Sequence, residues 1–182
     1  MSGPARMAGD TAVRRVVGLR SVPRGFSIGE LLIVVALVGI LAAVAIPSYS
    51  AYLVRGQRAA AKAALSQAAQ FMERNYTATG CYNFDSAAGC QGGAGTAIAL
   101  ASVNLDKAPA DGTTQTYVIT LASAAQNYTL TATPCATAGS CPAGSNQGFN
   151  DPDCGVLTLD NTGAKTASGT IGASTPALCW SR

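Results

Sequence analysis

An apolar run over residues 26–46 constrains this chain most, because its 21 residues include a single charged one, Glu30, near the beginning. As a helix the run would be about 30 Å long, which matches the hydrocarbon thickness of a bilayer. A carboxylate at one end of such a span is costly and is kept where it has a specific partner. The run therefore predicts a membrane-embedded helix with one functional acid.

The basic residues of the chain gather before this run. Residues 1–25 contain five arginines and one aspartate, a formal charge of +4, whereas the whole chain carries +3, so residues 26–182 carry −1. Positive charge ahead of a membrane span favours retention of that end in the cytoplasm. We therefore expect the C-terminal part to be exported.

Other interpretations of the same run compete with a membrane-embedded helix of this kind. Ala43-Val44-Ala45 resembles the A-x-A cleavage site of an ordinary secretory signal peptide. Glu30, however, would interrupt the apolar core of such a signal peptide. A plain membrane anchor explains the apolar run and leaves Glu30 without a role, unless its carboxylate snorkels to the headgroups. A lipoprotein signal does not fit, since the first cysteine is Cys81.

The residues around the start of the run resemble the class III signal of type IV pilins. The matching pattern is Gly25, Phe26, Ser27, Ile28, Gly29 and Glu30, followed by apolar residues 31–46. Gly29 departs from the Leu or Ile that relatives usually carry. The resemblance implies cleavage between Gly25 and Phe26 by prepilin peptidase, followed by N-methylation of Phe26. Leaders in this family are usually shorter than residues 1–25, and Met7 offers a later start.

The same resemblance implies roles for several residues of the mature chain. Glu30 matches the acid needed for assembly, where it would neutralise the Phe26 amine of a neighbouring subunit. Residues 39–47, bounded by Gly39 and Pro47, match a stretch that can unwind when subunits enter a filament. Tyr49, Tyr52 and Arg55 stand where relatives carry Tyr, Tyr and a basic residue.

Residues 48–78 are rich in alanine and predict a second, amphipathic helical part after Pro47, which would disturb the helix by removing a backbone donor. Leu65, Ala68, Met72 and Tyr76 recur at helical spacing and form one apolar stripe. The later part of the chain is expected to cover this stripe.

Alternation of apolar and polar residues predicts strands over residues 116–122, 127–133 and 155–160, with a short fourth strand over 165–168. Residues 79–114 show no clear period and predict a long connection. The expected fold is α+β, with a long N-terminal helix packed on a small antiparallel sheet. Residues 154–169 and the later Cys179-Trp180 resemble the C-terminal end of PilE-like pilins, which implies the pilin roll. The resemblance is weak over 83–114 and 134–153.

All six cysteines follow the apolar run, and an even number in an exported domain predicts disulfides, with fifteen possible pairings. We expect three local loops, Cys81–Cys90, Cys135–Cys141 and Cys154–Cys179. The last pair matches the bond that closes the C-terminal loop of relatives, where adhesive specificity usually resides. Alternatively, this bond only fixes the end of the chain.

Arg55, Arg58 and Lys62 lie at i, i+3 and i+7 and predict one basic helix face. This face is either solvated or paired with acids of neighbouring subunits, for which Asp106, Asp111 and Glu73 are candidates. Contact with lipid or DNA phosphates is a further option, although residues 26–182 carry no net positive charge.

Catalysis has little support, because the chain has no histidine and no nucleotide-binding glycine motif. Asn150, Asp151 and Asp153 offer oxygens to calcium but lack the later bidentate glutamate of an EF-hand, so a turn is the alternative. We expect no enzyme activity, no metal and no cofactor.

These observations predict a type IV pilus subunit with three segments: a removed leader (1–25), a membrane and polymerisation helix (26–47) and a periplasmic domain (48–182). The resemblance implies partners: further copies, other pilins, prepilin peptidase and the inner-membrane assembly platform. The subunit would span the inner membrane and then enter an extracellular pilus used in twitching, adhesion or DNA uptake. Alternatives are a type II secretion pseudopilin and a minor pilin acting as a DNA-uptake receptor, which a basic surface of Lys107, Lys165 and Arg182 would favour.

Overall fold

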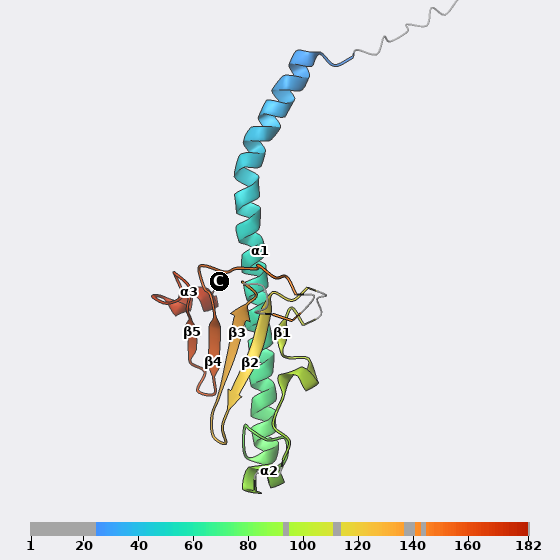
Figure 1. The fold of residues 1–182 in the computed structure, drawn as a ribbon. Coiled ribbons are helices and arrows are strands. Elements are labelled where there is room, and N and C mark those ends of the chain that lie inside the picture. Colours follow the sequence, from blue (N-terminus) through green and yellow to red (C-terminus); the bar gives the residue numbers. More distant parts are fainter. Residues whose placement is uncertain (1–24, 93–94, 111–113, 137–140, 143–144, 182) are drawn as a thin grey trace, which may run out of the picture. The chain divides into compact units, whose positions relative to one another are not determined.

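The structure, a computed structural model, describes residues 25–181 except 93–94, 111–113, 137–140 and 143–144. The leader up to Arg24, Asp111 and Arg182 therefore lie outside the described residues. The described residues form two compact units, one up to Ala43 and one from Val44 onward. Figure 1 shows the elements, which are α1 (Ile28–Thr79), α2 (Ala87–Gly92), η1 (Leu100–Val103), β1 (Lys107–Ala108), β2 (Tyr117–Ser123), β3 (Tyr128–Pro134), β4 (Leu157–Asp160), β5 (Lys165–Ala167) and α3 (Pro176–Ser181).

The first helix is long and continuous, and it begins where the sequence predicts. Glu30 lies in its first turn, where a negative charge interacts favourably with the helix dipole. The helical backbone runs through Gly39 and Pro47 without interruption. The expected disturbance at Pro47 is therefore absent from the secondary structure of this chain, and unwinding of residues 39–47 stays a prediction about the filament.

The second half of α1 carries the predicted apolar stripe. Leu65, Ala68 and Met72 are fully buried, and Tyr76 is partly buried against the same core. The helix ends at Thr79 because Gly80 takes a left-handed conformation (φ 89°), and its N–H donates to the Tyr76 carbonyl. The stripe is therefore the side of α1 on which the globular core is built.

The sheet has five antiparallel strands in the order β1-β2-β3-β4-β5. Side chains on one face alternate into the core, as Tyr117 and Ile119 do on β2 and Leu130 and Ala132 on β3. Together with Leu157 of β4 they share one hydrophobic cluster with the stripe on α1. This arrangement confirms the predicted α+β fold and the four predicted strands.

Four short elements lie where no regular structure was predicted. The connection after α1 contains α2, η1 and the two-residue strand β1, and α3 follows β5 near the C-terminus. None of these elements is long enough to show a hydrophobic period, since a strand or helix pattern needs several residues to repeat.

The cysteines form three disulfides, and these are the three pairs expected: Cys81–Cys90, Cys135–Cys141 and Cys154–Cys179. The last one ties α3 to the loop that precedes β4. It therefore closes a C-terminal loop that contains both β4 and β5.

Candidate functional site

No part of the chain that the structure describes covers the apolar residues at the start of α1. Phe26, Ile28, Leu31 and most large apolar side chains as far as Ile46 are exposed, in a segment long and apolar enough to cross a membrane. Monomeric proteins rarely expose so much contiguous apolar surface, and a patch of this kind marks contact with lipid or protein. Glu30 is also exposed, so its carboxylate is available to a group outside the chain.

Arg58 does not belong to an exposed basic face, because only 5% of its surface is accessible to solvent. Its Nε and Nη2 donate to the two carboxylate oxygens of Asp151, at 2.7 and 2.6 Å. The prediction of one solvated or intersubunit basic face was therefore wrong for Arg58, whose partner lies in its own chain. A sequence signal for this burial exists, since Arg58 stands three and seven residues before Ala61 and Leu65 and so extends the buried stripe.

Asp151 is the centre of a buried hydrogen-bond network. Besides Arg58, the Tyr117 hydroxyl donates to its Oδ2 at 2.8 Å and the Cys154 N–H donates to its Oδ1 at 3.2 Å. Burial by itself would raise the pKa of Asp151, but the bonds from Arg58 and Tyr117 outweigh it and hold that pKa below its ordinary value. Burial and the adjacent carboxylate raise the pKa of Tyr117.

The network replaces the calcium site considered for Asn150, Asp151 and Asp153. The Asp151 carboxylate is occupied by Arg58 and Tyr117, and the described residues contain no group of three acidic, histidine or cysteine side chains able to hold a metal. The acid thus has a structural role: it fixes the loop before β4 against α1 and β2.

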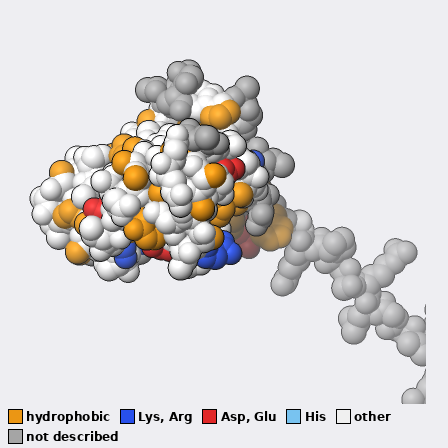
Figure 2. Space-filling view, turned by 90° about the horizontal axis from the view of Figure 1, so that it is seen from below, with side chains coloured by type: hydrophobic (Ala, Val, Ile, Leu, Met, Phe, Trp, Pro, Cys, Tyr) orange, Lys and Arg blue, Asp and Glu red, His pale blue; other side chains and the backbone are white. Residues whose placement is uncertain are grey.

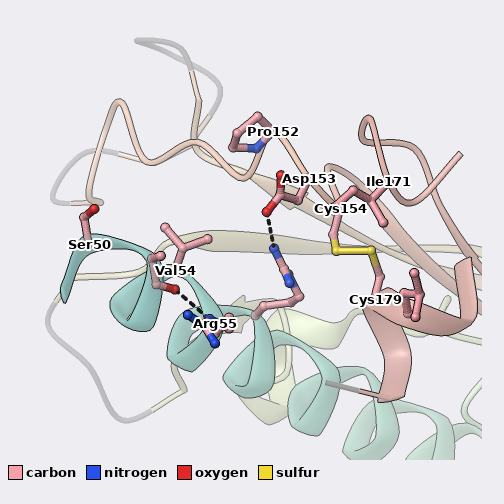
Figure 3. Close-up of a pocket in the computed structure, with 11 residues that line it drawn as sticks. Ser50, Val54, Arg55, Pro152, Asp153, Cys154, Ile171 and Cys179 are labelled. Carbon is pink, nitrogen blue, oxygen red and sulfur yellow. Dashed lines mark hydrogen bonds and ion pairs between the residues drawn. A yellow bond between two sulfur atoms is a disulfide. The ribbon is translucent and has the colours of Figure 1, made fainter. Parts of the chain in front are cut away.

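A half-open groove of about 480 Å³ lies beside this network, between α1 and the C-terminal loop. On the α1 side Val54 and Arg55 line it, and on the loop side Asp153, Ile171 and Leu178 line it. Figure 3 shows Arg55 on the helix, Asp153 on the facing loop and the Cys154–Cys179 disulfide forming part of the wall. We call this space the α1–loop groove.

Arg55 and Asp153 are the exposed charged residues of the α1–loop groove. Arg55 Nε donates to the Ala51 carbonyl at 3.1 Å, and among the described residues no carboxylate lies within ion-pair distance of it. The side chain of Asp153 is 56% exposed, and one of its oxygens lies 3.9 Å from Arg58 Nη2. Since Arg58 already binds Asp151 at 2.6 Å, its interaction with Asp153 is the weaker one.

Lys62, the third residue of the predicted basic face, lies at the end of the C-terminal loop. Its Nζ donates to the Trp180 carbonyl at 3.3 Å, while Lys165 Nζ lies 5.2 Å from the centroid of the Trp180 ring. Burial, then the charges of Arg58 and Lys165, lower the pKa of Lys62. The predicted face is thus divided among three environments: an exposed arginine, a buried ion pair and a lysine at Trp180.

Glu73, proposed as a partner of the basic face, contacts two tyrosines instead. The hydroxyls of Tyr82 and Tyr128 donate to its carboxylate at 3.0 and 3.1 Å. Tyr76 stacks on Tyr82, and Tyr128 meets Tyr82 edge to face. This cluster was not predicted, because its members come from α1, the loop after it and β3.

Lys107 and Lys165 do not form a joint basic surface. They lie on β1 and β5, the two edge strands of the sheet. Lys107 pairs with Val118, on the face opposite the buried Tyr117, whereas Lys165 pairs with the buried Leu159. Figure 2, a view from below, likewise shows basic side chains scattered among acidic and neutral ones.

Comparison with known proteins agrees with this architecture. A family model described as "Type IV minor pilin ComP, DNA uptake sequence receptor" matches residues 47–158. A "Type IV major fimbrial protein FimA" of Dichelobacter nodosus is 54% identical over 39 residues, 21% of this chain and 25% of the relative. A "Fimbrial protein" of the same organism is 54% identical over 41 residues, 22% and 26% of the two chains.

The aligned stretch thus spans about a quarter of the length of these fimbrial relatives. The family model covers more than half of this chain, including the second half of α1 and strands β1 to β3. With the second half of α1 packed on an antiparallel sheet, the chain belongs to the type IV pilin family, in the group of the ComP minor pilins.

Proposed function

We propose that the protein is a structural subunit of a type IV pilus that polymerises through the N-terminal part of α1. The observation that carries this proposal is the uncovered apolar surface of residues 26–46, in which Glu30 is the one charged residue. Such a surface would be covered by lipid before assembly and by the same segments of other copies in the filament. The globular part supplies no rival polymerisation surface of comparable apolar extent among the described residues.

The precursor would wait in the inner membrane with its C-terminal part in the periplasm. The basic residues before Gly25 support this orientation, and the disulfides suit an oxidising compartment. Prepilin peptidase would cleave between Gly25 and Phe26 and the Phe26 amine would be methylated. The inner-membrane assembly platform would then transfer the subunit into an extracellular filament.

Glu30 would pair with the Phe26 amine of a neighbouring subunit during this transfer. Both groups are costly to leave unpaired in an apolar environment, so pairing rewards the correct axial stagger of two helices. Gly39 and Pro47 would allow the helix to unwind locally as it packs among other copies. Both residues are weak positions in a helix, one through its flexibility and the other through its missing backbone donor.

The test is mass spectrometry of filaments sheared from the native host, combined with two variants of Glu30. A methylated Phe26 N-terminus in abundant filaments supports processing and assembly. Glu30→Gln should abolish filaments while the precursor accumulates in the membrane, and Glu30→Asp should retain part of the assembly because it keeps the charge. A mature chain that begins near Ile46 and is free in the periplasm would contradict the proposal.

A second candidate function is that of a DNA-uptake receptor within the pilus, which the description of the matching family favours. Lys107 and Lys165 support no joint DNA surface, so any binding would use other groups. The test is retardation of double-stranded DNA by the purified chain at increasing salt. Binding that weakens steeply with salt would support a receptor, since phosphate contacts release counterions. Absence of retardation at low salt would leave the structural role alone.

Members of the type IV pilin family are structural proteins, and we propose no enzymatic activity for this one. The chain would be a substrate of the peptidase rather than a catalyst. Its contribution to twitching, adhesion or DNA uptake would come from the surface that the filament displays.

A further inference from the structure

The α1–loop groove lies just beyond the apolar run. Its helix wall begins with Ser50 and Ala51, four and five residues after Ile46. At about 1.5 Å per residue, Ala51 is about 7.5 Å past the end of the run. The headgroup layer on each side of a bilayer is about 5–8 Å thick. If the run is embedded in the membrane, as proposed above, Ser50 and Ala51 of the groove lie at the level of the headgroups.

Arg55 is directed toward this level by its own hydrogen bond. Because Nε donates to the Ala51 carbonyl, the guanidinium lies one helical turn nearer the apolar run than the Arg55 backbone does. Its remaining N–H groups are available to an anion, and none of the described carboxylates lies within ion-pair distance of it. A phosphate is a favoured partner of arginine because it accepts two parallel hydrogen bonds.

Two exposed tyrosines precede Arg55 on the helix. Tyr49 and Tyr52 are spaced by three residues from each other and from Arg55, so neighbouring members adjoin along one ridge of α1. Tyrosine is enriched at the boundary between lipid and water, where its ring is apolar and its hydroxyl is hydrated. This ridge supports a lipid surface rather than a second protein as the neighbour of the groove.

The facing wall provides a negative charge and apolar contact. The Asp153 side chain is more than half exposed, and its Oδ2 lies 3.9 Å from Arg58 Nη2, a weak ion pair. Ile171 and Leu178, each 37% exposed, line the same wall. A ligand with an anionic group, a nearby cationic group and an apolar part would therefore match Arg55, Asp153 and the apolar wall at once.

We propose that the α1–loop groove binds the headgroup of a zwitterionic phospholipid of the ethanolamine class. The phosphate pairs with Arg55, and the primary ammonium donates hydrogen bonds to Asp153. A choline headgroup carries the same charges but has no N–H to donate, so it binds less well. This inference rests on the proposed function, because it requires the apolar run to be in a bilayer.

The test uses the full chain in nanodiscs made from equal amounts of phosphatidylethanolamine, phosphatidylcholine and phosphatidylglycerol. Native mass spectrometry then measures which lipids stay bound when the disc is removed. The wild-type chain should retain phosphatidylethanolamine about fivefold over phosphatidylcholine, the effect of one additional hydrogen bond from the primary ammonium. Asp153→Asn should remove this preference. Arg55→Gln should lower the retention of phosphatidylethanolamine itself, because Arg55 contacts the phosphate that all three lipids share.

Arg74→Gln is the matched control, because Arg74 is another exposed arginine on α1 whose Nε bonds to the carbonyl four residues before it, that of Gln70. It should keep the preference. Equal retention of the lipids, or an equal loss with Arg74→Gln, would overturn the inference. So would a preference for phosphatidylglycerol, or dimers without bound lipid, which would make the groove an interface between copies. A chain that fails to enter nanodiscs would instead contradict the proposed membrane span.

Discussion

Arg58 of α1 and Asp151 of the loop before β4 are 93 residues apart in sequence and form a bidentate ion pair at 2.7 and 2.6 Å. The pair joins the helix to the segment that begins the C-terminal disulfide loop. Because both side chains are buried, each is the principal compensation for the desolvated charge of the other. The position of the α1–loop groove therefore depends on this contact.

Asp151→Asn should destabilise the protein by about 3–5 kcal/mol, because it removes the bidentate partner of the buried Arg58 charge and leaves only the more distant, exposed Asp153 carboxylate near it. The measurement is the free energy of unfolding of the full chain in mild detergent, from urea titration followed by circular dichroism. Asp153→Asn is the control and should cost less than about 1 kcal/mol, since its side chain is 56% exposed. Equal losses in the two variants would show that the buried pair has no special role.

The same pair predicts how stability changes with pH. The folded-state pKa of Asp151 lies below its ordinary value of 3.8, so the unfolded state takes up a proton first as the pH falls. The contribution of Asp151 is thus fully present above pH 3.8 and is lost as the pH falls through the folded-state pKa. Urea unfolding from neutral to acidic pH should show the difference between wild type and Asp151→Asn shrinking over this window. A difference that stays constant would contradict the assignment.

Removal of the Cys154–Cys179 disulfide by a double serine substitution should cost about 3 kcal/mol, because this bond spans 25 residues and restricts the unfolded chain. The same change at Cys135 and Cys141, which are 6 residues apart, should cost about 2 kcal/mol. Calorimetry of the oxidised variants measures both effects. The reverse order would indicate that native contacts, rather than loop length, determine the loss.

Alanine substitution of two leucines of α1 should affect different properties, stability in one case and filament assembly in the other. Leu65 is fully buried, and Leu65→Ala should destabilise the globular part by about 2–5 kcal/mol through a cavity. Leu31 is 56% exposed, and Leu31→Ala should leave the unfolding free energy of the single chain unchanged but reduce the yield of sheared filaments. An effect of Leu31→Ala on single-chain stability would mean that residues 26–46 are covered within the chain.

Sequence patterns predicted the features that repeat locally. The apolar stripe from Leu65 to Met72 and the alternation in β2 and β3 gave the helix, the strands and the α+β class, because burial imposes periods of 3.6 and 2 residues. Nearness in sequence predicted the Cys81–Cys90 and Cys135–Cys141 disulfides. The resemblance to pilins predicted Cys154–Cys179. β1 and α3 were missed because they are too short to repeat a pattern.

The candidate site was less predictable, since it depends on contacts between distant segments. Helical spacing grouped Arg58 with Arg55 and Lys62, whereas in the folded chain Arg58 forms a buried ion pair with Asp151. Glu73 likewise meets Tyr82 and Tyr128 rather than a basic residue. In both cases the helical spacing identified the face, but the tertiary partner decided whether the side chain is solvated.

The edges of the sheet are the two-residue strand β1 and the three-residue strand β5, and their shortness has a consequence for the pilus assembly proposed here. Long, flat edges invite strand-to-strand joining between molecules, which leads to amyloid-like deposits. Edges this short offer few backbone hydrogen bonds to an incoming chain. In a filament, such edges would allow subunits to lie at high local density with little tendency to join irreversibly through their strands.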